Sequence, residues 1–256
     1  MEEIIDLIFN QFQLFLLVVV RTSGIFVFSP FFSSQNVPNV AKIGLTLSIS
    51  IIISMTLTSP VDYSILPLTI VIFKELLVGI IIGFISYAFF SAFYVMGQII
   101  DMKIGFGMAN VIDPQNRIQI PLMGNFYYIF SFIILLGING HHRIILALKE
   151  SYNYIPINGF KYTEGSMAII IDTLAKAFEL GLKLSMPIVV IIFLTDIILG
   201  ILSKTIPQLN VFVVGMPFKI LIGLLLILVG MPIFFNSMDS IFDLIINNMY
   251  KFIKTK

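Results

Sequence analysis

Long runs of hydrophobic residues, separated by short polar segments, cover most of the chain. A helix needs about 20 apolar residues to cross the hydrocarbon core of a bilayer, and roughly six runs meet or approach that length. They span residues 12–32, 43–57, 65–95, 126–148, 184–202 and 209–235. The pattern predicts an all-α, polytopic integral membrane protein of about six hydrophobic helices, forming a single membrane-embedded domain over residues 1–256.

The last run contains several residues that interrupt helices, namely Gly215, Pro217, Gly230 and Pro232. In lipid such breaks are tolerated where neighbouring groups satisfy the backbone atoms that they free. We therefore expect this helix to be kinked and buried against protein.

Two segments beside the runs have the charge pattern of amphipathic helices. In residues 166–183, Asp172 and Lys176, and then Glu179 and Lys183, lie four positions apart along one face. The tail, residues 237–256, has acids in its first turns and lysines at its end, as the helix dipole favours. Each segment is predicted to be an amphipathic helix.

Composition supports a membrane protein and excludes several other classes. The residues are 58% hydrophobic and only 11% charged, whereas soluble domains carry about a quarter charged residues. The net charge of +1 lacks the basic footprint of a protein that binds nucleic acid. Without cysteine, the chain has neither disulfides nor thiolate metal sites. Membrane lipid is thus the first expected partner.

Four ionisable residues fall inside the hydrophobic runs: Arg21, Lys74, Glu75 and Asp196. Each is costly in lipid, so each is expected to face protein or water and to have a partner. Adjacent residues on a helix point about 100° apart, so Lys74 and Glu75 are not expected to pair with each other. Arg21 is expected to pair with Glu75 or Asp196. Such groups form either a proton or ion relay or a buried charge clamp that fixes helix assembly.

Catalytic motifs are absent from the sequence. His141 and His142 lack the H-E-x-x-H spacing of a zinc site and follow an Asn-Gly pair that predicts a turn. The Gly105-Phe106-Gly107 triplet is not followed by the Lys-Ser/Thr of a phosphate loop, and there is no G-x-S-x-G motif. We expect no catalytic residue, no cofactor and no metal.

The densest polar and turn-forming stretch of the interior lies at residues 98–121, within a central segment that we delimit as 97–123. It predicts a long loop or a broken helix. Apolar Met102, Phe106 and Met108 accompany its glycines, and Asp113-Pro114 favours a tight turn. The segment is either a polar connector or a set of apolar groups that seals an opening.

Several motifs occur in an order that resembles the flagellar biosynthetic protein FliR family over most of the chain. The first part contains Arg21, Gly24, Pro30, Pro38, Lys42, Glu75, Gly79 and Gly83. The middle part contains Gly97-Gln98, Gly105-Phe106-Gly107, Asp113-Pro114 and Asn139-Gly140-His141. The last part contains Pro187, Asp196, Gly200, Pro207, Gln208, Asn210, Phe212, Gly215, Pro217 and Lys219. A mild departure is Ile104, where the family often has methionine.

This resemblance implies a subunit of the bacterial flagellar type III export gate, through which unfolded flagellar proteins cross the inner membrane at the basal body. It implies assembly with FliP-like and FliQ-like subunits into a conical complex, with helices folded as hairpins around a pore and a FlhB-like protein at the cytoplasmic side. The implied plug comprises Met102, Gly105, Phe106, Gly107, Met108, Asp113 and Pro114. The implied assembly motif comprises Pro207, Gln208, Asn210, Phe212, Gly215, Pro217 and Lys219.

Three alternatives stay open at this stage. The nearest is the equivalent subunit of a virulence injectisome, which sequence patterns separate poorly from the flagellar protein. A small-molecule or ion transporter predicts inverted repeats with broken helices at matching positions, and no convincing internal repeat is found. A membrane enzyme predicts a convergent polar site, which the motif search does not find.

The composition predicts that the chain stays soluble only in detergent and sediments with the membrane fraction. Ultracentrifugation of a lysate, followed by extraction with and without mild detergent, measures this directly. Recovery of a monodisperse monomer without detergent would contradict the membrane assignment.

Overall fold

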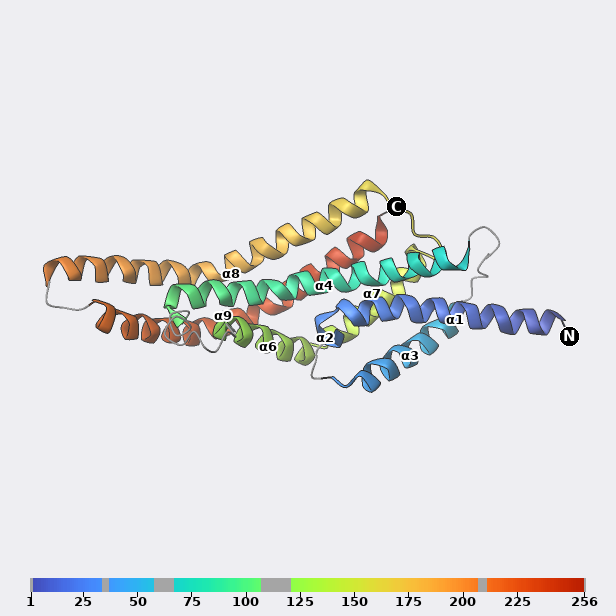
Figure 1. Ribbon diagram of the computed structural model, residues 1–256, viewed down its shortest axis with the longest axis horizontal. Helices are drawn as coiled ribbons and strands as arrows, with labels where there is room; N and C mark the ends of the chain where they lie inside the picture. Colours follow the sequence, from blue (N-terminus) through green and yellow to red (C-terminus); the bar gives the residue numbers. More distant parts are fainter. Residues whose placement is uncertain (1, 34–36, 58–66, 107–120, 207–210, 256) are drawn as a thin grey trace. The chain divides into compact units, whose positions relative to one another are not determined.

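The protein is built from α-helices. The computed structural model describes residues 2–33, 37–57, 67–106, 121–206 and 211–255, and no strand occurs among them. The helices are α1 (Glu2–Phe28), α2 (Pro30–Ser33), α3 (Asn39–Thr56), α4 (Leu68–Ile104), α6 (Leu122–Gly137), α7 (Gly140–Tyr154), α8 (Glu164–Thr205) and α9 (Val211–Lys254) (Figure 1). Their apolar composition confirms the predicted all-α membrane protein.

Five of these helices are long and apolar enough to cross a membrane, and a sixth span results if α6 and α7 count as one broken span. The expected run at 126–148 is in fact divided, because the chain breaks at Ile138 and Asn139 between these two helices. Asn139 has a φ of 55°, in the left-handed region that asparagine tolerates better than most residues. The turn predicted from Asn139-Gly140 is therefore confirmed.

Two boundaries differ from those expected. The amphipathic segment 166–183 and the run 184–202 form one helix, α8, which continues through Pro187. Likewise the run 209–235 and the tail form one helix, α9, which continues through Pro217 and Pro232. A helix can continue where its sequence changes from apolar to amphipathic, because the change affects only what surrounds the helix. The change in hydrophobic pattern therefore did not mark a helix end.

The described residues group into two compact units, each made of segments that are distant in sequence. Unit 1 comprises Met1–Ala88, Asn139–Thr173 and Asp243–Lys256, and unit 2 comprises Phe89–Ile138 and Leu174–Phe242. Helices α4, α8 and α9 each contribute residues to both units. The units are thus not successive domains, and the single membrane-embedded domain stays a prediction.

In unit 1, α1 lies beside α3 and crosses α4 at very short range (Figure 1). A Cβ atom on Gly79 would collide with the backbone oxygen of Arg21, and one on Gly24 would lie 2.8 Å from the backbone nitrogen of Ile80. A Cβ atom on Gly83, one turn after Gly79, would lie 3.1 Å from the Cα atom of Ile25. The G-x-x-x-G step therefore lets two helix backbones touch, as small residues do in membranes.

In unit 2, aromatic side chains from α4, α6 and α9 form the core. The Phe234 ring lies 5.7 Å from that of Phe93 and 5.1 Å from that of Tyr127, both edge to face. The Phe90 ring lies edge to face with that of Phe93 at 5.8 Å and is tilted against that of Phe242 at 5.9 Å. Edge-to-face pairs add about 0.5–1.5 kcal/mol each to the burial of their apolar area, so this cluster holds the three helices together.

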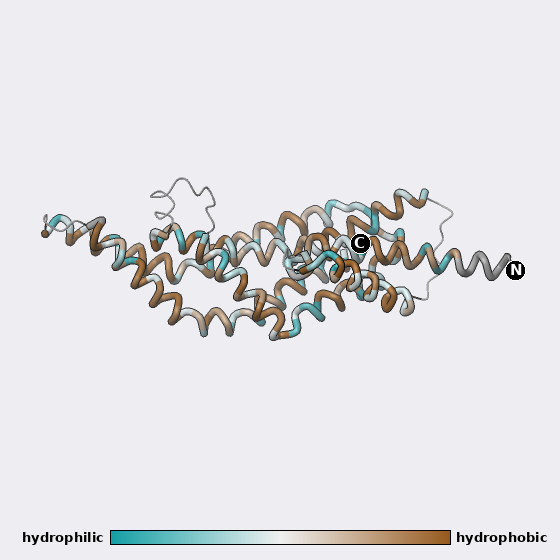
Figure 2. The backbone as a smooth tube through the Cα atoms, turned by 60° about the horizontal axis from the view of Figure 1, so that its bottom comes forward, coloured by the Kyte–Doolittle hydropathy of each residue, from teal (hydrophilic) through white to brown (hydrophobic). Residues whose placement is uncertain are grey.

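Large hydrophobic side chains also cover much of the outside of the chain. Val40 is 82% exposed, and the apolar residues Leu228, Val229 and Ile233 of α9 are each more than two-thirds exposed. Figure 2 shows hydrophobic residues along nearly the full length of the long helices. Exposed apolar area of this extent is expected of surfaces that face lipid or partner proteins.

The contact between α1 and α4 generates a test with a matched control. Gly79→Ala should lower the melting temperature of the purified chain in detergent, because the added methyl group forces apart two backbones in contact, at a cost of about 1–3 kcal/mol or more. Gly44→Ala in α3, where an added Cβ meets no atom within 4 Å, should not lower it. Equal melting temperatures for both variants would show that the close crossing is not needed.

Candidate functional site

A buried ion pair lies at the centre of unit 1. The Nε atom of Arg21, on α1, donates to Oε2 of Glu75, on α4, at 2.7 Å. Both side chains have 0% exposure. The pairing of Arg21 with Glu75, one of the two expected from the sequence, is confirmed. Arg21 lies three residues before Gly24 and Glu75 four before Gly79, so the pair is adjacent to the close helix crossing.

Helix α7 supplies two further contacts to the guanidinium group of Arg21. Its Nη1 atom donates to the hydroxyl oxygen of Ser151 at 3.0 Å, and Ser151 in turn donates to the carbonyl oxygen of Leu148. The guanidinium carbon lies 4.0 Å from the centre of the Tyr152 ring. A cation over an aromatic face gains more when both are removed from water, so Tyr152 helps to hold the charge.

The turn after α7 completes the environment of Glu75. The backbone N–H of Asn158 donates to Oε1 of Glu75 at 3.0 Å. Asn158 has a φ of 64°, a left-handed conformation that asparagine tolerates. Lys74, half-buried, donates from Nζ to the Asn158 side-chain oxygen at 3.2 Å. Adjacent Lys74 and Glu75 thus bind the same turn instead of each other, as their angular separation predicted.

Four chain segments therefore meet at one buried charge pair: α1, α4, α7 and the turn at Asn158. Removing one partner from such a pair leaves an uncompensated charge, which costs about 3–5 kcal/mol. Both oxygens of Glu75 accept hydrogen bonds from fixed donors. This geometry favours the clamp over a proton relay.

Asp196 does not join this cluster. Its Oδ1 atom accepts from Nζ of Lys219 at 2.7 Å, and its side chain is 42% exposed. The pair connects α8 with α9 inside unit 2, whereas Arg21 belongs to unit 1. Asp196 is consequently a partly exposed surface acid and not a member of the buried set in which the sequence placed it.

The predicted assembly motif lies partly on α9. Gly215, Pro217 and Lys219 are in this helix, whereas Pro207, Gln208 and Asn210 lie outside the described residues. Phe212 lies in the first turn of the helix. Lys219 contacts Asp196, so one member of the motif joins α8 to α9.

Helix α4 extends to Ile104, so the helical part of the central segment is longer than the sequence suggested. Met102 is on its last turn, with 65% exposure, and Phe106 is half-buried. Gly105 ends the helix with a φ of 101°, which strains any other residue. Gly107, Met108, Asp113 and Pro114 lie outside the described residues, so their proposed role in a plug stays a prediction.

Asp101 holds the end of α4 against the start of α6. Its carboxylate oxygens accept the backbone N–H of Met123 at 2.9 and 3.1 Å and that of Gly124 at 3.3 Å. Asp101 is only 5% exposed. The sequence placed this acid among the polar residues of the central segment without a role. Two features of the sequence could have indicated this contact. One is an acid near the end of a helix, and the other is the Pro-Leu-Met-Gly sequence that begins the next helix.

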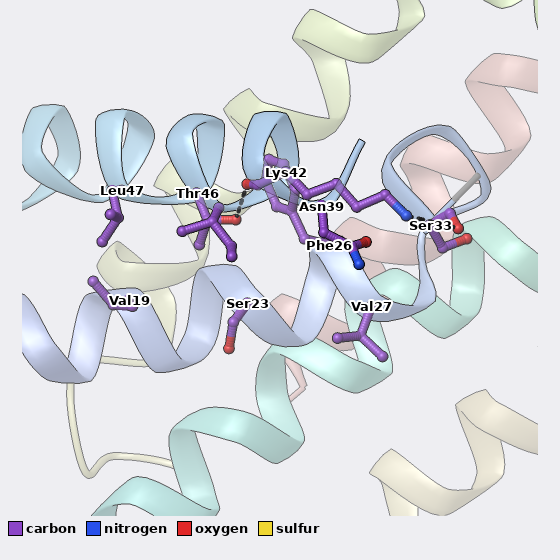
Figure 3. A pocket seen from close by; sticks show the side chains of 10 residues that line it. Val19, Ser23, Phe26, Val27, Ser33, Asn39, Lys42, Thr46 and Leu47 are labelled. Carbon is purple, nitrogen blue, oxygen red and sulfur yellow. Dashed lines mark hydrogen bonds between the residues drawn. The ribbon is translucent and has the colours of Figure 1, made fainter. Parts of the chain in front are cut away.

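A cavity of about 430 Å³ lies between α1 and α3 in unit 1 (Figure 3). Val19, Phe26 and Leu47 provide apolar walls, and Lys42 is the one charged residue that lines it. Nζ of Lys42 donates to the backbone oxygen of Ser33 at 3.2 Å. Ser23, Ser33 and Thr46 add hydroxyl groups to the lining, and no acid or histidine is among the lining residues.

Sequence similarity connects the chain with proteins of bacterial export. The chain matches the family described as Bacterial export proteins, family 1, over residues 12–245. It is 37% identical to flagellar biosynthetic protein FliR of Bacillus subtilis (strain 168), over 97% of this chain and 96% of the relative. The corresponding protein of Aquifex aeolicus (strain VF5) is 28% identical over 94% and 91%. Surface presentation of antigens protein SpaR of Shigella flexneri is 28% identical over 65% of each chain.

The ion pair generates a charge-reversal test. Arg21→Glu should reduce the melting temperature of the chain in detergent strongly, since it places two acids together where burial costs most, with a loss of about 3–5 kcal/mol. Adding Glu75→Arg should restore part of the loss.

Two variants serve as controls for this test. Arg143→Glu disrupts an exposed pair with Asp243 and should cost under about 1 kcal/mol. Asp196→Arg should fail to rescue Arg21→Glu, because Asp196 pairs with Lys219. A wild-type melting temperature for Arg21→Glu alone would refute the clamp.

Proposed function

Because the chain belongs to family 1 of the bacterial export proteins, and is a membrane-embedded subunit of the flagellar type III export gate, we propose how its structure serves that gate. Its helices form part of the wall of a pore for unfolded flagellar proteins. The part of its central segment from Gly105 to Leu122 closes the pore at rest. The match along residues 12–245, which includes both ends of the central segment and the buried ion pair, is the observation that carries this proposal.

The exposed apolar surfaces support a role within a larger assembly. Helices α8 and α9 carry large hydrophobic side chains on much of their length, and many of these are exposed in the isolated chain. FliP-like and FliQ-like subunits, together with lipid, would cover such faces, and a FlhB-like protein would complete the cytoplasmic side. The proposed location is the inner membrane at the flagellar basal body.

A pore for an unfolded chain must hold back ions while no substrate is passing. Apolar side chains that close on one another and separate around a peptide satisfy both demands, and thioethers adapt to irregular gaps. Met102 is exposed on the last turn of α4, and Phe106 is half-buried just after that helix ends. Both residues lie where the chain leaves α4. Glycine at 105, with its positive φ, allows the chain to turn away from the helix there.

The role that we propose is not catalytic. The buried acid Glu75 is held by two fixed donors, and the buried acid Asp101 is held by the first turn of a helix. Neither carboxylate is therefore free to act as a general base. The chain instead contributes shape, an apolar lining and assembly contacts.

The equivalent subunit of a virulence injectisome is the second candidate. Its support is the match with SpaR, which covers 65% of this chain at 28% identity. The match with FliR of Bacillus subtilis covers 97% of it at 37% identity. The flagellar assignment is therefore the better supported one.

Removing residues 110–119 tests the closing role. We expect the assembled complex to leak ions or small solutes at rest while export of flagellar proteins is at least partly kept. The measurements are dye release from vesicles that contain the purified complex, and secretion of flagellar proteins by cells that carry the variant.

A glycine-serine replacement of the same ten residues is the matched control for chain length. It should leak as the deletion does, because it also lacks the native side chains of residues 110–119, Asp113 and Pro114 among them. A tight membrane around a correctly assembled variant complex would show that the seal lies elsewhere.

A further inference from the structure

We infer that Asp101 is a positioning residue for the gate: its carboxylate fastens the start of α6 to the end of α4 and so fixes the two ends of the central segment relative to each other. This inference rests on the proposed closing role of residues 105–122. It concerns only described residues, on α4 and α6 within unit 2.

The geometry of Asp101 is that of a helix cap supplied from a distance. Leu122 is the first residue of α6, so Met123 and Gly124 are its second and third. Their N–H groups have no partner inside the helix. Both Asp101 oxygens accept from Met123, and one also accepts from Gly124, although Asp101 and Met123 lie 22 positions apart. The carboxylate therefore satisfies donors that the helix itself leaves open.

No local residue performs this task. The N-cap position of α6 is Pro121, and it makes no side-chain cap hydrogen bond. An ionised carboxylate at a helix N-terminus gains from charge-assisted hydrogen bonds and from the helix dipole. Asp101 is only 5% exposed, so competition from water is weak and a loss of these bonds would leave buried amides unsatisfied.

A second contact joins the same two helices one turn earlier on α4. A Cβ atom on Gly97 would collide with the backbone of Met123 and Gly124, and one on Gly124 would lie 3.2 Å from the backbone oxygen of Tyr94. Residues 97 and 101 lie four apart and so share one face of α4. Gly97 sets how closely α6 approaches this face, and Asp101 sets where along it α6 begins.

The consequence concerns the central segment. Helix α4 ends at Ile104, three residues after Asp101, and α6 begins at Leu122, one residue before Met123. The segment thus leaves and rejoins the fold at points held together by one carboxylate.

The alternative is that Asp101 only stabilises the first turn of α6. Moving the cap to the local position distinguishes the two. Asp101→Ala removes the tether and the cap together. Adding Pro121→Asp restores a carboxylate at the N-cap of α6, where aspartate is among the favoured residues, but does not restore the connection to α4.

The experiment compares Asp101→Ala, Asp101→Asn, the double variant Asp101→Ala/Pro121→Asp and Pro121→Asp alone. Asp239→Asn, an exposed acid of α9 in unit 2, is the control for charge. Each variant is measured in the assembled complex for hydrogen exchange at the amides of Met123 and Gly124, for dye leakage at rest, and for export of flagellar proteins.

We expect Asp101→Ala to raise exchange at both amides about 10- to 100-fold, as loss of hydrogen bonds to a charged group implies, and to increase leakage. Asp101→Asn, which keeps one acceptor oxygen, should show smaller effects of the same kind. The double variant should recover amide protection while leakage stays high. Asp239→Asn should behave as wild type, and Pro121→Asp alone, which keeps the Asp101 tether, measures how far the substitution at position 121 itself changes leakage.

Recovery of a tight membrane in the double variant would overturn the inference, because a local cap would then suffice. A tight membrane and normal export in Asp101→Ala, alongside leakage in the 110–119 deletion, would also overturn it while leaving the closing role intact. If the deletion itself does not leak, the closing role fails; unchanged amide exchange in Asp101→Ala would separately show that Asp101 does not hold α6.

Discussion

The ion pair between Arg21 and Glu75 is the interaction on which unit 1 depends. Neither side chain is exposed, so each charge depends on buried partners. Ser151, Tyr152 and the backbone N–H of Asn158 add such partners to the pair, although Nη2 of Arg21 makes no hydrogen bond to the described residues, and these contacts bring α7 and the following turn onto α1 and α4. The need of the buried charges for partners thus determines which segments meet. Apolar contacts specify this poorly in lipid, because lipid tails are as apolar as the helix surfaces.

Short-range glycine contacts make this arrangement possible. Gly24 and Gly79 let the backbones of α1 and α4 touch beside the charge pair, and Gly97 and Gly124 do the same for α4 and α6 beside Asp101. In both places a buried carboxylate lies next to a close helix crossing. The glycines determine how near two helices come, and the acid determines their register. The remaining apolar surface is left for lipid and for other subunits of the export apparatus.

The sequence predicted the helices, and it predicted burial of Arg21 and Glu75 but not the exposure of Asp196, because it registers the cost of a charge in lipid and not which helix face carries it. It also allowed the pairing of Arg21 with Glu75, since few other partners were available. It did not identify Ser151 or Asn158, because a hydroxyl group and a backbone amide carry no signal until the fold brings them near. Asp101 was overlooked for a similar reason: its partners are backbone N–H groups that lie 22 residues away or more. Helix ends inside α8 and α9 were misplaced because a change in hydrophobic pattern does not break a helix.

Under the proposed function, this chain works as one subunit of a larger assembly, which covers the apolar faces of α8 and α9. The most direct test is native mass spectrometry of the complex that an affinity-tagged chain recovers from its own cells in a mild detergent. A single large species that contains several different membrane subunits in fixed ratio, with this chain among them, is the expected result. A monomer, or an assembly of this chain alone, recovered from cells that export flagellar proteins normally would contradict the account.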